Sequence, residues 1–457
     1  MTIENAIAEL APHFGDRLSR TLAVREQHGH DEAHHAPKPP DAVIWPRSTA
    51  EVALVARTCH ANGCPIVPWG TGTSLEGQVI PVQGGISLDF AQMDQVLSVH
   101  AEDMDVVVQP GIRRKRLNEY LRDTGLFFPV DPGADASLGG MAATRASGTC
   151  AVRYGTMREA VLALEVVMAD GRVIRTGSRA RKSSAGYDLT KLFVGSEGTL
   201  GIITELTIRL HGVPEAISAA TCAFERMEDA VNAVIQTIQM GVPVARIELL
   251  DALTIRGFNG YSGYDMPERP TLFLEFHGSE AGVAEHAETV GEIARDHGCL
   301  GFDWTTNPEE RGRLWQARHD VYYAQQSLRK GSRGYVTDAC VPISRLAEAI
   351  LETAEDLAAS PLIAPLVGHV GDGNFHLAIL IDPENPAEKV EAERLGMRIS
   401  ERALRLGGTV TGEHGVGLGK RKFMQAEHGE AWAVMGDIKR TLDPHGILNT
   451  GKIVPGN

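Results

Sequence analysis

The hydrophobic pattern of the first part of the chain predicts a βαβ unit that begins at Ala42. Val43-Ile44-Trp45 has the apolar composition of a strand. Ser48 is a favourable N-cap, Glu51 three residues later completes a capping box, and Gly63 ends the helix that follows. An amphipathic helix is expected earlier, within residues 1–23, because apolar residues recur there at helical spacing.

The pattern continues with strands up to about residue 210. Apolar runs predict strands at 86–89, 105–109, 163–168, 173–176 and 202–210, and a helix at 117–124. Asp170-Gly171 is a tight-turn pair, so the strands on either side of it are expected to form a hairpin. Residues 1–211 are therefore expected to form one α+β unit.

The second half alternates strands and helices at a longer spacing. Strands are predicted at 218–224, 246–250 and 271–276, and helices at 227–240, 281–297 and 345–357. This alternation predicts a second α+β domain over residues 212–405, with its helices on one side of a sheet.

Composition excludes several kinds of partner. The chain has 457 residues, with 44 Lys and Arg against 59 Asp and Glu, which gives a net charge of −15. An acidic balance argues against nucleic acid and against electrostatic docking to an anionic membrane. No apolar run reaches the roughly 18 residues that a transmembrane helix needs. The six cysteines form no C-x-x-C pair or disulfide framework, so a reducing compartment is expected. We therefore predict a cytoplasmic protein, with peripheral attachment to the inner membrane left open.

A glycine-rich loop at Pro68–Gly77 follows a short apolar run and is a candidate phosphate-binding element. Glycine lets backbone N–H groups approach a phosphate closely. Leu75 stands where a dinucleotide fingerprint needs its third glycine, and Gln78 stands where a P-loop needs lysine. The loop is therefore neither of these motifs, and a tight surface turn remains the alternative.

Two later stretches share this character. Asp131–Gly155 consists largely of Gly, Ala, Ser and Thr, and Gly195–Gly201 contains three glycines. Small residues let the backbone lie against a flat, extended ligand. In this order, the three stretches resemble the FAD domain of the vanillyl-alcohol oxidase and p-cresol methylhydroxylase (PCMH) superfamily.

That resemblance implies noncovalent FAD, with the first loop on the pyrophosphate and residues 137–155 along the isoalloxazine and ribityl chain. The residues implied to contact FAD are Pro68, Gly70, Thr71, Gly72, Thr73, Ser74, Gly77, Pro132, Gly133, Ala134, Ser137, Gly140, Ala143, Ser147, Gly148, Val152, Tyr154, Gly155, Glu197, Gly198, Ile203 and Asn449.

A predicted hairpin in the second domain carries two histidines. Apolar residues flank Gly371-Asp372-Gly373-Asn374, which has turn composition. A four-residue loop there would place His369 directly opposite His376, with Cβ atoms roughly 4.5–5.5 Å apart. Two neighbouring imidazoles suit one metal ion. Two ordinary polar positions on a hairpin are the alternative.

Thr411–Gly417 adds a carboxylate and a third imidazole. Glu413 with His369 and His376 would make a three-ligand site with open positions, and His414 would be left as an acid–base group. A surface turn is the alternative for this short motif.

Together these residues closely resemble the FAD-linked D-2-hydroxyacid dehydrogenases. In that family the two His and the Glu bind a divalent metal, Zn or Mn, and the following His, here His414, takes the substrate hydroxyl proton. Arg318 is implied to bind the substrate carboxylate, and Asn374 is assigned as a catalytic residue from the same match. Residues 406–457 are implied to return to the flavin and complete the active site.

Among the subgroups, the sequence around residues 318–342 is most similar to the D-lactate dehydrogenases with a cytochrome-type acceptor. The resemblance implies oxidation of a D-2-hydroxy acid, D-lactate to pyruvate first, with hydride transfer to flavin N5 and electrons passed to cytochrome c, a quinone or an electron-transfer flavoprotein. A homodimer is one option for the assembly. Arg145 and Cys150 depart from the small or amide residues expected at their positions.

Several alternatives stay open. One is the D subunit of a glycolate oxidase. Another is a D-2-hydroxyglutarate dehydrogenase, for which Lys330 or Arg333 would be the second carboxylate anchor. More distant are an alkyl-dihydroxyacetone-phosphate synthase-like flavin transferase and a flavin-binding subunit without activity.

Overall fold

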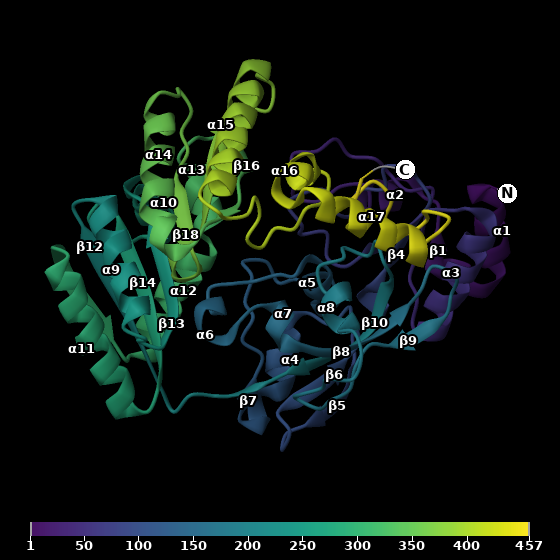
Figure 1. Cartoon of the computed structure of the whole chain (residues 1–457), viewed down its shortest axis with the longest axis horizontal. Helices are drawn as coiled ribbons and strands as arrows, with labels where there is room; N and C mark the ends of the chain where they lie inside the picture. Colours follow the sequence, from purple (N-terminus) through teal and green to yellow (C-terminus); the bar gives the residue numbers. More distant parts are fainter. Residues whose placement is uncertain (1, 456–457) are drawn as a thin grey trace. The chain divides into compact units, whose positions relative to one another are not determined.

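The computed structural model describes residues 2–455 and divides into two compact units (Figure 1). Unit 1 contains Met1–Ser147, Gly155–Val213 and Glu413–Asn457. Unit 2 contains Gly148–Tyr154 and Pro214–Gly412. Among the described residues, no helix combines the length and apolar character needed to cross a membrane.

A four-stranded sheet opens unit 1, in the order β1-β2-β4-β3. Its strands are β1 (Leu18–Ser19), β2 (Ala42–Ile44), β3 (Ile66–Trp69) and β4 (Ile86–Asp89). Strand β4 is parallel to both β2 and β3, and helix α3 (Thr49–Asn62) connects β2 to β3, so the predicted βαβ unit is present. Its core joins residues of helix α1 (Ile3–Phe14) and α3 with Leu448 from the C-terminal segment.

The predicted caps of α3 are confirmed in part. Ser48 accepts a hydrogen bond from the Glu51 backbone N–H, and Gly63 adopts the left-handed conformation that ends the helix. The expected reciprocal half of the capping box is not formed. The Glu51 carboxylate instead binds the Arg17 guanidinium and the Arg47 backbone N–H, because a charged donor offers a stronger hydrogen bond than a second backbone amide.

A five-stranded sheet follows, in the order β5-β6-β10-β8-β9. Its strands are β5 (Val96–His100), β6 (Asp105–Val108), β8 (Val161–Val167), β9 (Val173–Arg175) and β10 (Ile202–Arg209). Strands β8 and β9 pair antiparallel across Asp170-Gly171, as predicted. A small ladder joins β7 (Leu126–Phe127) to β11 (His211–Gly212). The remaining helices of unit 1 are α2 (Leu22–Gln27), α4 (Arg114–Leu121), α5 (Leu138–Thr144), α7 (Met157–Ala160), α8 (Leu189–Phe193), α16 (Met424–His428) and α17 (Glu430–Leu442).

Unit 2 is built on an antiparallel sheet with the order β15-β12-β14-β13-β18-β19-β16, to which β17 adds by pairing with β19. The strands are β12 (Ala216–Phe224), β13 (Val244–Leu250), β14 (Thr271–Gly278), β15 (Cys299–Thr305), β16 (Arg333–Val336), β17 (Ala339–Cys340), β18 (Leu366–His369) and β19 (Asn374–Ile381). The helices are α6 (Ala151–Tyr154), α9 (Met227–Gln239), α10 (Ala252–Ser262), α11 (Glu280–Asp296), α12 (Pro308–His319), α13 (Val321–Ser327), α14 (Leu346–Ala358) and α15 (Pro386–Arg405).

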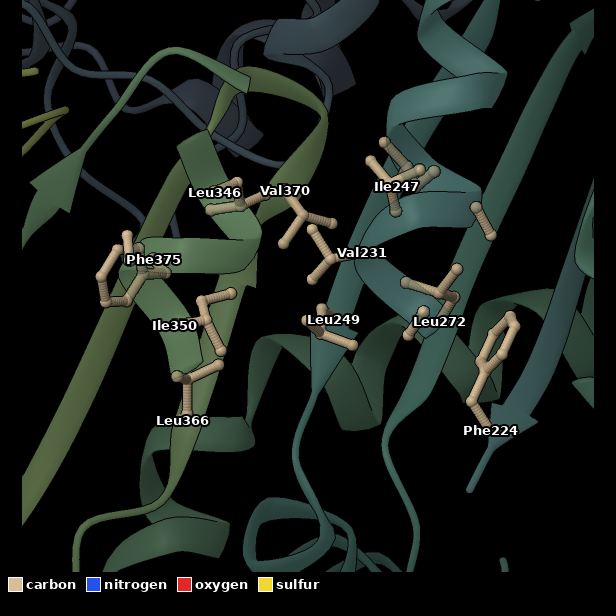
Figure 2. Packing of buried hydrophobic residues seen from close by; sticks show 14 of the residues in the cluster. Phe224, Val231, Ile247, Leu249, Leu272, Leu346, Ile350, Leu366, Val370 and Phe375 are labelled. Atoms are coloured by element: carbon tan, nitrogen blue, oxygen red, sulfur yellow. The ribbon is translucent and has the colours of Figure 1, made fainter. Parts of the chain in front are cut away.

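Helices cover both faces of this sheet, so the expectation of helices on one side is wrong. On one face, α9, α11, α14 and α15 pack over strand residues such as Leu249 and Phe375 (Figure 2). On the other face, α10, α12 and α13 pack over Leu250 and Phe273. Helix α12 lacks a clear apolar stripe in the sequence because one of the residues it buries is Arg318, which breaks the hydrophobic pattern.

The histidine hairpin forms with a different register from the one predicted. His369 pairs with Asn374, and His376 pairs with Val367. The chain turns at Val370–Gly373, one residue earlier than expected, with Val370–Asp372 in a 3-10 turn and Gly373 left-handed. A shift of two positions along the partner strand preserves the face on which each side chain lies, so the two histidines stay on one face as diagonal neighbours.

Candidate active site

One face of the unit 2 sheet carries a row of polar side chains. Side chains alternate along each strand, so Glu248 lies on the same face as Leu250, and His369 on the same face as Val367. His376 joins them because its strand neighbours Phe375 and Leu377 belong to the opposite core. The face with α12 and α13 therefore passes from an apolar cluster into polar residues on neighbouring strands.

The two histidines lie side by side on this face. Their ring centroids are 5.4 Å apart at 78°, and a ring nitrogen of His369 lies within 4.8 Å of one of His376. His369 Nδ1 lies 2.7 Å from Glu248 Oε1, and His376 Nδ1 lies 3.2 Å from the carbonyl oxygen of Thr337. Both partners accept hydrogen bonds, so each Nδ1 is a donor, and in the neutral imidazole the lone pair is then on Nε2. That tautomer is the one that a metal-binding imidazole needs.

Arg318 is buried beside the same carboxylate. Its Nη2 donates to Glu248 Oε2, and its side chain is about 7% exposed. Arg318 Nε has no hydrogen-bond partner among the described residues, and neither does Trp315 Nε1 one helical turn earlier. Buried N–H groups without partners are costly and are rare in native proteins, so these two donors suit a bound acceptor such as a carboxylate.

Asp338 organises the other end of the histidine hairpin. Its carboxylate accepts hydrogen bonds from Asn374 Nδ2 at 2.7 Å and from Thr411 Oγ1 at 2.7 Å. Asn374 Nδ2 also donates to the Ala339 carbonyl, so in this structure Asn374 holds loops in place. A Cβ built on Gly412 would lie 2.3 Å from Asn374 Nδ2. Unit 2 ends at Gly412, and Glu413 begins the last stretch of unit 1.

The segment after Glu413 belongs to unit 1 and is held there by two buried side chains. Gln78 Nε2 donates to the His414 carbonyl at 2.6 Å. Glu197 accepts from the backbone N–H groups of Val416 and Gly417 at 2.7 and 2.9 Å. Burial raises the pKa of Glu197 to about 7, against these hydrogen bonds and the nearby Lys452. The backbone on the C-terminal side of His414 is therefore fixed by unit 1.

The three small-residue stretches meet within unit 1. A Cβ built on Gly70 would lie 2.3 Å from Ser137 Oγ, and one built on Gly198 would lie 2.8 Å from Pro68 Cγ. Asn449 from the C-terminal segment donates to the carbonyls of Gln78 and Glu197 at 2.9 and 2.7 Å. The loops assigned to FAD by resemblance therefore lie close together, and the C-terminal segment is hydrogen-bonded to them.

The predicted flavin residues are not all in one unit. Unit 1 holds Pro68, Gly70, Thr71, Gly72, Thr73, Ser74, Gly77, Pro132, Gly133, Ala134, Ser137, Gly140, Ala143, Ser147, Gly155, Glu197, Gly198, Ile203 and Asn449, whereas Gly148, Val152 and Tyr154 belong to unit 2. Tyr154 Oη lies 2.7 Å from His277 Nδ1, within unit 2. The Glu197 carboxylate is engaged by the 416–417 backbone, so it serves this loop in addition to its predicted place near FAD.

The two departures from the family pattern have local partners. Arg145 adopts a left-handed conformation at the end of α5 and donates from Nη2 to the Val194 carbonyl at 3.2 Å. Burial lowers the pKa of Arg145 from its ordinary value. Cys150 Sγ accepts from Arg246 Nε at 3.1 Å.

Sequence reasoning assigned no role to Gln78, Glu248 or Asp338. Glu248 had a detectable signal, because a charged residue within the apolar run Ile247–Leu250 is expected to be buried and paired. Gln78 was noted only as the residue that breaks a P-loop, and its bond to the His414 carbonyl links positions 336 residues apart. No local pattern reports such a contact.

Comparison with known proteins gives a consistent family. Residues 40–177 match the family model of the FAD binding domain, and residues 213–453 match that of the C-terminal domain of FAD linked oxidases. The chain is 52% identical over 457 residues to the probable mitochondrial D-lactate dehydrogenase of Danio rerio, covering 99% of the chain and 92% of that relative. It is 46% identical over 452 residues to the mitochondrial D-lactate dehydrogenase (cytochrome) of Arabidopsis thaliana, covering 98% and 80%.

Among solved structures, p-cresol methylhydroxylase with substrate bound superposes with a TM-score of 0.80 at 18% identity, covering 98% of this chain and 96% of that one. This likeness concerns the fold. The predicted α+β fold, with a PCMH-type FAD-binding domain followed by a second α+β domain, is confirmed.

The predicted cytoplasmic location is wrong. Both relatives are named as mitochondrial proteins. The cysteine argument separates reducing from oxidising compartments, and it does not distinguish one reducing compartment from another.

Proposed function

The chain belongs to the FAD-linked oxidases, and from that membership we propose that it oxidises a D-2-hydroxy acid, with D-lactate as substrate and pyruvate as product. The observation that carries the proposal is the polar row of unit 2. It gathers on one sheet face a buried arginine and two imidazoles whose Nδ1 atoms each face a hydrogen-bond acceptor. An α-hydroxy acid carries a carboxylate next to a hydroxyl group. A buried cation can bind the carboxylate, and a metal held by the neighbouring nitrogen atoms can bind the hydroxyl group.

FAD fits the converging loops of unit 1. Gly70 packs against Ser137 and Gly198 against Pro68 with no room for a Cβ, which brings the three loops together. Glycine-rich loops of this kind can turn backbone N–H groups toward a phosphate. The bound flavin would supply the hydride acceptor. No cysteine or histidine in these stretches matches a family attachment site, so we propose noncovalent binding.

As the family resemblance implies, His369, His376 and Glu413 would hold a divalent metal, Zn²⁺ or Mn²⁺. Two Nε2 lone pairs and one carboxylate form a donor set that both ions accept. When bound there, the ion would lower the pKa of a ligated hydroxyl group. The hydrogen bond from His369 Nδ1 to Glu248 leaves the Nε2 of His369 to bind the metal. The hydrogen bond from His376 Nδ1 to the Thr337 carbonyl does the same for His376.

The remaining steps fall to side chains of the chain itself. Arg318 binds the substrate carboxylate and so orients the α-carbon. His414 accepts the α-hydroxyl proton as general base, and Asn374 holds the hairpin against Asp338. Trp315 Nε1 offers a further donor beside Arg318. Electrons then pass to an external acceptor, for which the name of the plant relative suggests a cytochrome.

Anaerobic bleaching of the flavin absorbance tests this function. The purified holoprotein is mixed with D-lactate, L-lactate, glycolate or D-2-hydroxyglutarate, before and after chelation. We expect rapid bleaching by D-lactate that chelation abolishes and that Zn²⁺ or Mn²⁺ restores. Bleaching by glycolate alone, or by D-2-hydroxyglutarate alone, would show that this acid is the substrate instead of D-lactate. If the flavin of metal-replete protein stayed oxidised with every acid, the proposed dehydrogenase activity would be refuted.

A further inference from the structure

We propose that Glu248 is a positioning residue that serves both halves of this site at once, and this inference rests on the proposed function. One carboxylate oxygen fixes the tautomer and direction of His369. The other fixes the guanidinium of Arg318. Metal ligation and carboxylate recognition therefore depend on a single side chain.

Both contacts of the Glu248 carboxylate are close and shielded from water. Glu248 Oε1 lies 2.7 Å from His369 Nδ1, while Oε2 accepts from Arg318 Nη2. The Glu248 side chain is 1% exposed, so water does not compete for either oxygen. Glu248 projects from β13 toward α12, and β13 pairs directly with β18, the strand that ends at His369.

The chemistry of the two partners explains why a carboxylate is needed. Arg318 Nη2 and His369 Nδ1 are both donors, so the residue between them must offer two acceptors. A glutamine offers one acceptor and one donor, and it can satisfy only one of them. A histidine that donates to a buried carboxylate is also a more basic metal ligand, and loss of such partners weakens metal binding by about 10–100-fold.

Unit 2 contains a matched control on the same sheet face. Glu275 on β14 is also buried, and its carboxylate lies 2.8 Å from His277 Nε2 and 3.4 Å from Arg246 Nη1. It is a second Glu–His–Arg group, and it includes none of the proposed metal ligands. Loss of Glu275 therefore reports the effect of removing a buried carboxylate from this sheet without touching His369.

The experiment compares Glu248→Gln and Glu275→Gln with the wild type as flavin-loaded full-length proteins. Mn²⁺ affinity is measured calorimetrically after chelation, and KM and kcat are measured with D-lactate. We expect Glu248→Gln to bind Mn²⁺ about 10–100-fold more weakly and to raise KM at saturating Mn²⁺, and Glu275→Gln to keep its Mn²⁺ affinity. Equal Mn²⁺ affinities for folded Glu248→Gln and wild type would overturn the inference.

A second measurement needs no folded variant at position 248. In wild-type protein with ¹⁵N-labelled histidine and no metal, His369 should show a protonated Nδ1, assigned by the signal missing from His369→Gln. A protonated Nε2 with a bare Nδ1 would overturn the inference. Failure of the wild type to bleach with any 2-hydroxy acid would instead refute the proposed function, while the tautomer would still decide the role of Glu248.

Discussion

At the scale of single residues, the proposed site depends on donors that the protein itself does not saturate. Arg318 uses Nη2 on Glu248, and its Nε has no partner among the described residues. A guanidinium with donors to spare can hold a carboxylate through two parallel hydrogen bonds, which a lysine cannot reproduce. Its replacement should therefore affect substrate binding more than flavin binding.

Arg318→Lys should raise the KM for D-lactate by about 10–100-fold, because loss of a charge-assisted hydrogen bond costs roughly 1.5–3 kcal/mol. Steady-state kinetics with an artificial acceptor measures it, and the flavin content of the variant should equal that of the wild type. An unchanged KM would remove Arg318 from substrate binding.

Glu197 should give the protein a pH-dependent stability. Burial raises its pKa to about 7 from an ordinary 4.5, so its contribution is complete below about 4.5 and is lost as the pH rises through 7. We expect the free energy of unfolding to fall by up to about 3 kcal/mol over that window. Glu197→Gln, which keeps an acceptor for the 416–417 backbone, should lack this component in denaturant titrations between pH 5 and 7.5.

Lys452 does not obscure that window. Burial lowers its pKa to about 8 from 10.5, so its contribution to stability rises only as the pH passes through 8. A wild-type stability that stays flat between pH 5 and 7.5 would mean that Glu197 ionises as easily in the folded state as in the unfolded chain.

At the scale of elements, the 413–417 loop is constrained where it carries His414. Gly415 has φ +79°, and a Cβ there would lie 2.5 Å from Glu197 Oε1 and 2.8 Å from Gln78 Nε2. Gly415→Ala should therefore displace His414 and lower kcat by at least about tenfold, since small misplacement of a catalytic group is costly. Rapid flavin reduction by D-lactate measures this loss.

Gly312→Ala is the matched control for that variant. Gly312 lies inside α12, has no heavy atom within 4 Å of a built Cβ, and does not have a positive φ. Alanine should stabilise the helix by about 0.5–1 kcal/mol and leave kcat unchanged. Similar kcat losses in both variants would show that the protein tolerates no added methyl group, rather than that the loop is special.

The elements also show where sequence reasoning succeeds and where it stops. Strands with strong apolar runs, such as β4 and β10, and the βαβ unit follow from local pattern. The hairpin register failed by two positions because the turn formed one residue early, yet the face of His376 was right because side chains alternate with period two. Helix α12 was missed because it buries Arg318. The apolar run around Glu248 indicates that it is buried and paired, but its partners lie 70 and 121 residues away and could not be identified from the sequence.

At the scale of the whole molecule, the C-terminal segment is an integral part of unit 1. Lys439 Nζ, which is buried, donates to the carbonyls of Thr199 and Leu448 at 2.8 and 2.7 Å. Leu448 forms a parallel bridge with Ile66 at the start of β3, the strand that leads into the glycine-rich loop at Pro68–Gly77. The ammonium group of Lys439 therefore connects the C-terminal segment to Thr199, and the backbone of Leu448 connects it to β3.

Lys439→Met should destabilise the protein by about 2–3 kcal/mol, because it removes the donor to two buried carbonyls and leaves the buried Asp443 carboxylate without its cation. Lys422→Met, at an exposed position, should change stability by less than about 0.5 kcal/mol. Denaturant unfolding followed by flavin fluorescence measures both. If Lys439→Met were as stable as the wild type, apolar packing alone would hold the C-terminal segment in place.

The division of unit 1 into three stretches has a consequence for synthesis of the protein. Its last stretch begins at Glu413, after the whole main body of unit 2 has been translated. At about 5–20 residues per second, the ribosome needs roughly 10–50 s to pass from Val213 to the end of the chain. During that time Gln78, Glu197 and Thr199 lack the partners that Asn449 and Lys439 later provide. The loops that we assign to FAD therefore lack these contacts until the C-terminal segment has been made, so we expect FAD to be captured late in the maturation of the enzyme.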